Sequence, residues 1–227
     1  MSPIDTRSTS ETFLSLMSHV EELIDAGRMG EARRILTQFL GRKDIDTRML
    51  PALAGLYLRI GRTEAAVRTM KRAIAGRPED AELHNSLGLI YASLGRECDS
   101  REEFELALSL DPANADALRN LAFILHRSGE HAEAYGLLVR CYRATPLSVE
   151  LRLICGTLLE LDGRLDEAAN CYRDAMDLGG VSEQVERAAQ RMFALGDDRP
   201  MLGFEEIVAR LEAEHLGDDR IVTECRD

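Results

Sequence analysis

The sequence predicts an all-α fold, a solenoid in which antiparallel helix pairs stack one on another. Three observations predict this fold. Glycine recurs every 34 residues, small residues flank each glycine at fixed distances, and apolar residues on both sides follow the i, i+3, i+4, i+7 spacing of a helix face. The recurring glycines are Gly27, Gly61, Gly95, Gly129 and Gly163.

Placing each glycine at position 15 of a 34-residue unit aligns five units without gaps. Apolar positions 4, 7, 8 and 11 form one face of a first helix, and positions 20, 24, 27 and 28 form one face of a second. Glycine tolerates the left-handed conformation that closes a helix, so each unit is a helix, a tight turn and a helix. The predicted units span residues 13–46, 47–80, 81–114, 115–148 and 149–182.

Small residues occupy the positions at which the two helices of a unit would approach each other. Position 8 is Val20, Ala54, Gly88, Ala122 or Gly156, and position 20 is Ala32, Ala66, Ser100, Ala134 or Ala168. Proline at position 32 ends the second helix in the three central units, as Pro78, Pro112 and Pro146. We therefore expect close helix pairs separated by short connections.

The third unit, AELHNSLGLIYASLGRECDSREEFELALSLDPAN, resembles a tetratricopeptide repeat, because its L-G-x-x-Y, G, F-x-x-A-L and D-P residues stand at matching offsets. The resemblance covers residues 13–182, although position 4 lacks the large aromatic residue typical of the family. It implies a right-handed superhelical solenoid. It also implies that the first helices line a concave groove that binds a peptide or helix of a partner protein.

The remaining segments are predicted to be a cap and two tails. Residues 183–217 contain two amphipathic stretches and are expected to form a degenerate sixth helix pair that covers the last apolar face. Residues 1–12 and 218–227 are expected to be flexible tails.

Composition excludes several function classes. A net charge of −12 and a pI near 5.0 argue against nucleic-acid binding, which needs a basic surface. We expect no membrane insertion, and the polar N-terminus MSPIDTRSTSET lacks the apolar core of a secretion signal, which predicts a cytoplasmic protein. Arginine supplies 26 of the 28 basic residues, a bias that favours a bacterial source.

The expected groove carries a specific set of side chains. Amides could hold a peptide backbone, guanidinium groups could bind carboxylates, and an exposed aromatic ring could anchor an apolar side chain. The alternative is that these are ordinary solvated residues. The candidate partner-binding residues are Arg48, Arg59, Asn85, Leu89, Arg119, Asn120, Phe123, His126, Arg127, Arg187 and Arg191.

Catalytic and cofactor-binding motifs are not found in the sequence. It has no GxxxxGK[ST], GxGxxG, GxSxG or HExxH pattern, so we expect no enzyme and no cofactor. His126 and His131 flank Gly129 without a nearby cysteine or third histidine, which argues against a zinc site. His19 and His84 fall in core-facing columns and are expected to be buried.

The sequence thus predicts a non-enzymatic scaffold or adaptor that binds a protein partner in its groove. Two alternatives stay open. One is a chaperone for secretion or pilus assembly, and the other is a regulatory module associated with a transferase. Self-association through an end or through the groove is compatible with each.

Overall fold

The computed structural model describes residues 6–41, 45–178, 186, 190 and 203–215. These residues belong to two compact units, Met1–Leu110 and Asp111–Asp227, and every described regular element is helical. No described helix is long and apolar enough to cross a membrane.

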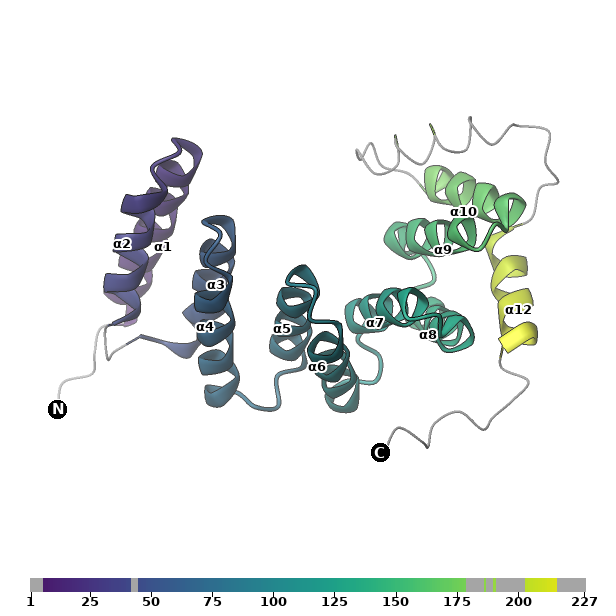
Figure 1. Cartoon of the computed structure of the whole chain (residues 1–227), viewed down its shortest axis with the longest axis horizontal. Helices are drawn as coiled ribbons and strands as arrows, with labels where there is room; N and C mark the ends of the chain where they lie inside the picture. The colour runs from purple at the N-terminus through teal and green to yellow at the C-terminus, as the bar shows by residue number, and fades with distance from the viewer. Residues whose placement is uncertain (1–5, 42–44, 179–185, 187–189, 191–202, 216–227) are drawn as a thin grey trace. The chain divides into compact units, whose positions relative to one another are not determined.

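The first unit consists of three helix pairs whose members pack side by side (Figure 1). The first helix of the third pair begins at Ala81, where a repeat was predicted to start. The second pair is preceded by a short 3₁₀ turn, Thr47–Met49. The helices are α1 (Thr6–Asp25), α2 (Met29–Leu40), α3 (Leu50–Arg59), α4 (Thr63–Gly76), α5 (Ala81–Ser93) and α6 (Glu97–Leu110).

The described residues of the second unit form two helix pairs and one further helix (Figure 1). The first helices of its pairs begin at Ala115 and Val149, again at predicted repeat starts, and each is capped by the residue before it. Asn114 accepts a hydrogen bond from the Ala117 N–H at 2.8 Å. The helices are α7 (Ala115–Arg127), α8 (His131–Ala144), α9 (Val149–Leu161), α10 (Leu165–Asp177) and α12 (Phe204–His215).

The recurring glycines close the first helix of every pair in the left-handed conformation, as predicted. At the α3–α4 turn, Gly61 has a φ of 70°, and the next residue, Arg62, donates its N–H to the Tyr57 carbonyl at 2.7 Å. This bond satisfies a carbonyl that the helix itself leaves without a partner. The five φ values lie between 70° and 86°, at Gly27, Gly61, Gly95, Gly129 and Gly163.

The small residues at position 8 bring the paired helices into contact. A Cβ atom placed on Gly88 would lie 2.6 Å from the Phe104 ring, and one on Gly156 would lie 2.7 Å from the Tyr172 ring. Ser100, at position 20, donates its hydroxyl to the Gly88 carbonyl at 2.8 Å. Because both rings are almost fully buried, the glycines provide the space into which these aromatic side chains pack.

Two expectations about the N-terminal part are wrong. The first helix begins at Thr6, so residues 6–12 are helical where a tail was predicted. A helix that is already nucleated extends at little cost through polar residues, which carry no apolar pattern for sequence analysis to detect. His19 is exposed, with 58% of its side chain accessible, because the contacts of α1 with α2 and α3 leave its position uncovered. His84, by contrast, is buried as expected and lies 2.8 Å from a carboxylate oxygen of Glu103.

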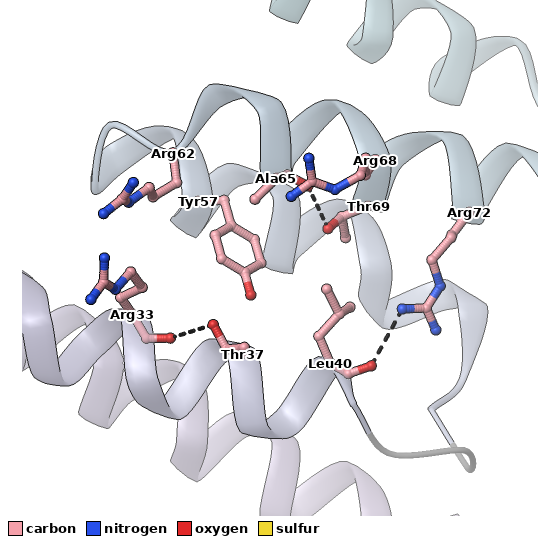
Figure 2. A pocket seen from close by; sticks show the side chains of 9 residues that line it. All are labelled: Arg33, Thr37, Leu40, Tyr57, Arg62, Ala65, Arg68, Thr69 and Arg72. Atoms are coloured by element: carbon pink, nitrogen blue, oxygen red, sulfur yellow. Dashed lines mark hydrogen bonds between the residues drawn. The ribbon is translucent and has the colours of Figure 1, made fainter.

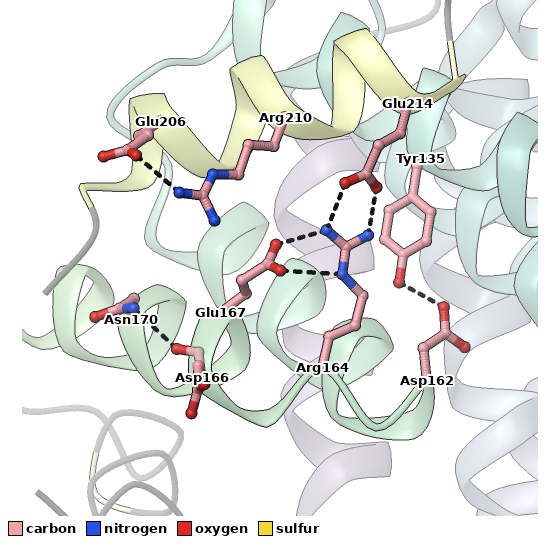
Figure 3. Close-up of polar contacts among 9 residues, drawn as sticks. All are labelled: Tyr135, Asp162, Arg164, Asp166, Glu167, Asn170, Glu206, Arg210 and Glu214. Carbon is pink, nitrogen blue, oxygen red and sulfur yellow. Dashed lines mark hydrogen bonds and ion pairs between the residues drawn. The ribbon is translucent and has the colours of Figure 1, made fainter. Parts of the chain in front are cut away.

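The second amphipathic stretch of the predicted cap forms α12, which packs mainly on α8 and also on α10. Its apolar face is buried, and the Phe204 ring meets the Tyr142 ring edge to face at 5.5 Å. Arg164 links the α9–α10 turn to both Glu167, at 2.7 Å, and Glu214 of α12, at 2.8 Å (Figure 3). The first stretch of the predicted pair lies largely outside the described residues, so the pairing itself stays a prediction.

Candidate functional site

Four candidate groove residues lie on the first helices of the first unit or next to them. Arg48 pairs with Asp46 at 2.6 Å, and Arg59 of α3 pairs with Asp25 of α1 at 2.9 Å. On α5, Leu89 is 48% exposed, whereas Asn85 is only 5% exposed. The arginine charges are therefore partly balanced by neighbouring carboxylates, and Leu89 presents an apolar side chain to solvent.

In the second unit, α7 carries the other candidates that the structure describes. Phe123 is 39% exposed and Arg127 is exposed, while Asn120 is half-buried. Arg119 forms an ion pair with Asp116 one turn before it on the same helix. The last two candidates, Arg187 and Arg191, lie outside the described residues.

Two of the predicted groove residues are not available as surface contacts. Asn85 and His126 are 5% and 6% exposed, so neither side chain can present its polar atoms freely to a partner. Their positions in the repeat predicted exposure, but neighbouring side chains cover them. For His126 the covering group is visible, because its Nε2 lies 2.9 Å from the Asp162 carboxylate.

Asp162 follows α9, and its carboxylate contacts three polar side chains of the preceding helix pair. Its Oδ1 atom lies 2.9 Å from His126 Nε2 and 3.4 Å from His131 Nδ1. Its Oδ2 atom accepts a hydrogen bond from the Tyr135 hydroxyl at 2.7 Å (Figure 3). Burial and this bond to Asp162 raise the pKa of Tyr135, so the phenol remains a proton donor at neutral pH. Sequence analysis did not reveal this cluster, because Asp162 stands in the next repeat.

A second feature that sequence reasoning missed is an arginine-lined cavity of about 400 Å³ between α2 and α4. Figure 2 shows Arg33 and Arg62 at one end and Arg72 at the other, where Arg72 donates to the Leu40 carbonyl at 3.3 Å. None of the described residues that line it is acidic, although the whole chain carries a charge of −12. The lining residues are Arg33, Thr37, Leu40, Tyr57, Arg62, Ala65, Arg68, Thr69 and Arg72.

Family comparisons identify the repeats independently. Models described as tetratricopeptide repeat match residues 52–114 and 103–135. These matches lie within the second to fourth predicted units.

Two curated proteins of Pseudomonas aeruginosa are similar to part of the chain. The type IV pilus assembly protein PilF is 29% identical over 89 residues, which cover 39% of this chain and 35% of PilF. The probable biofilm formation methyltransferase WspC is 34% identical over 83 residues, which cover 37% of this chain and 20% of WspC. The chain thus spans only a minor part of both relatives.

Solved structures agree on the fold. A thermophilic tetratricopeptide-repeat protein of Thermus thermophilus, TTC0263, superposes with a TM-score of 0.64 at 20% identity, covering 80% of this chain and 99% of that one. One assignment, the tetratricopeptide repeat, agrees with the sequence matches, with the left-handed turn glycines and with the antiparallel helix pairs. The chain therefore contains tetratricopeptide repeats, which the family models place within residues 52–135.

Proposed function

We propose that the chain is a non-enzymatic adaptor that holds a peptide or helix of a partner protein against its first helices. Tetratricopeptide repeats generally mediate contacts between proteins, which supports this class of function. The proposal includes a location in the cytoplasm and no binding of nucleic acid, since the chain is strongly acidic overall.

The observation that carries the proposal is the exposure of large apolar side chains on first helices. Leu89 of α5 and Phe123 of α7 are 48% and 39% exposed and stand among polar neighbours. Apolar anchors within a polar surround are typical of the residues that dominate the free energy of protein binding. Covering either side chain with a partner segment would remove apolar surface from water, at about 25 cal/mol per Å².

The arginine-lined cavity supports a second contact with the same partner. Its guanidinium groups attract carboxylates, and arginine can bind a carboxylate through two parallel hydrogen bonds. We therefore expect the partner to carry an acidic segment in addition to its apolar one. Replacing Arg33 and Arg68 by Glu should weaken the complex and reduce its sensitivity to salt. If this pair of changes has no effect, the cavity is not a contact, and the role of Leu89 and Phe123 is judged separately.

The principal experiment compares partners captured from a lysate of the source organism by the wild type and by point variants. Leu89→Ser and Phe123→Ser should each lose the same partner while circular dichroism shows unchanged helicity. Leu106→Ser is the matched control, because Leu106 is 43% exposed but lies on α6, outside both the first helices and the arginine-lined cavity. Size-exclusion chromatography of each variant separates partner loss from a change in self-association. An identical set of captured proteins for all three variants would contradict the proposal.

Two alternatives are kept because relatives favour them. Similarity to PilF favours a chaperone for pilus or secretion assembly, and similarity to WspC favours a module that serves a methyltransferase. Both similarities cover less than two fifths of this chain, which is why the general adaptor is preferred. A gene neighbourhood that encodes secretion or pilus components would favour the chaperone, and one that encodes a methyltransferase would favour the module.

A further inference from the structure

Three side chains that can bind metal ions converge where the turns of two consecutive helix pairs meet. His126 lies in the last turn of α7, His131 is the first residue of α8, and Asp162 follows α9. One ligand atom from each residue lies within 4.8 Å of the other two. The ring centroids of His126 and His131 lie 4.4 Å apart, and the ring planes are nearly perpendicular. In this arrangement each ring directs one nitrogen toward the Asp162 carboxylate.

The two distances to Asp162 are close to those around a small divalent ion. Ligands about 2.1 Å from a tetrahedral zinc ion lie about 3.4 Å from one another. Asp162 Oδ1 lies 2.9 Å from His126 Nε2 and 3.4 Å from His131 Nδ1. The distances from Asp162 to the two histidines therefore differ from the zinc values by no more than about half an ångström, and the two histidine nitrogens already lie within 4.8 Å of each other.

The surroundings support and orient these ligands. Tyr135 donates its hydroxyl to the other Asp162 oxygen at 2.7 Å, which fixes the carboxylate as outer-shell partners do in metal sites. His126 is held in the protein interior, with 6% of its side chain exposed, whereas 45% of the His131 side chain is exposed. The exposed side gives an ion a route from solvent and leaves a fourth position for water or a partner's side chain.

We propose that His126, His131 and Asp162 bind one divalent transition-metal ion. Two imidazole nitrogens and one carboxylate oxygen suit zinc, cobalt or nickel better than magnesium or calcium, which prefer all-oxygen sites. The ion joins the α7–α8 turn to the residue that follows α9. It thereby fastens two consecutive repeats at their turns.

The test is isothermal titration of the tag-free chain with zinc chloride. All proteins carry Cys98→Ser and Cys225→Ser to remove competing thiols, and Cys98 is exposed. The wild type should bind one zinc ion and show a raised Tm when zinc is added. His131→Ala should lose more than about 100-fold in affinity, and Tyr135→Phe about 10–100-fold through the outer shell.

His19→Ala is the matched control, because His19 is an exposed histidine whose Nδ1 lies 3.9 Å from a carboxylate oxygen of Glu22. It should bind zinc like the wild type. Circular dichroism and melting in the presence of a chelator verify that every variant is folded before zinc is added. Failure of the wild type to bind zinc would overturn the proposal and leave a hydrogen-bonded cluster. Binding that is unchanged in His131→Ala would overturn it as well.

Discussion

The packing of Gly88 against Phe104 predicts that a larger residue at position 88 lowers the free energy of unfolding. In the Gly88→Ala variant the new methyl group would lie 2.6, 2.7 and 3.1 Å from three atoms of the Phe104 ring. The ring is 1% exposed and cannot rotate into solvent, so either the ring or helix α6 must shift. Overpacking of this kind costs about 1–3 kcal/mol, while alanine gains about 0.5–1 kcal/mol over glycine in a helix interior. The net prediction is a loss of up to about 2.5 kcal/mol, and no net gain.

Gly55→Ala is the matched control for this effect. Gly55 lies inside α3, and a Cβ atom there would meet no described atom within 4 Å. Only the helix preference remains, so this variant should gain about 0.5–1 kcal/mol. Urea unfolding followed by circular dichroism measures both changes, and a loss of about 1 kcal/mol corresponds to about 2–4 °C in Tm. If Gly88→Ala stabilises the protein as much as Gly55→Ala does, the close approach of α5 and α6 is not what requires glycine at position 88.

Further predictions concern charge, backbone conformation and thiol reactivity. Ala134→Glu and Ala168→Glu each place a carboxylate at a fully buried position. Urea titration should show that each lowers the free energy of unfolding by about 3 kcal/mol or more. Near-native stability of both variants would contradict the repeat register. Gly61→Ala should cost about 1–2 kcal/mol through its φ of 70° alone, since no described atom lies within 4 Å of the new Cβ, and an unchanged midpoint would argue against backbone strain. Burial raises the pKa of the Cys171 thiol, whereas Cys98 is exposed. Under native conditions, peptide mass spectrometry should therefore find Cys98 alkylated well before Cys171. Equal alkylation rates of the two thiols would contradict the burial of Cys171.

The helix pairs could be predicted from sequence because each depends on local, repeated features. The glycine at Gly61 and its four equivalents mark turns through a backbone conformation that few other residues adopt. Gly88 and Gly156 mark close helix contacts because no larger side chain fits beside the aromatic ring of the paired helix. Such constraints act within one unit, so the 34-residue period reveals them without knowledge of the neighbouring units.

The candidate site was less predictable because its exposure depends on neighbours in other units. His126 occupies a groove-facing position by periodicity, yet it is buried against Asp162 in the following repeat. An amphipathic stretch was predicted where α12 lies, but amphipathicity does not say which helix covers its apolar face, formed by Phe204, Ile207, Val208 and Leu211. The arginine cavity brings together residues from two consecutive repeats, which no local pattern could identify.

Site-specific photo-crosslinking at the exposed apolar positions tests the adaptor proposal most directly. A photoreactive benzoylphenylalanine is placed at position 123 on α7, at position 89 on α5 or at position 106 on α6, and the proteins are irradiated in a lysate of the source organism. The proposed function predicts that positions 89 and 123 crosslink to the same partner and that position 106 does not. Crosslinks to that partner from position 106 alone would contradict binding through the first helices.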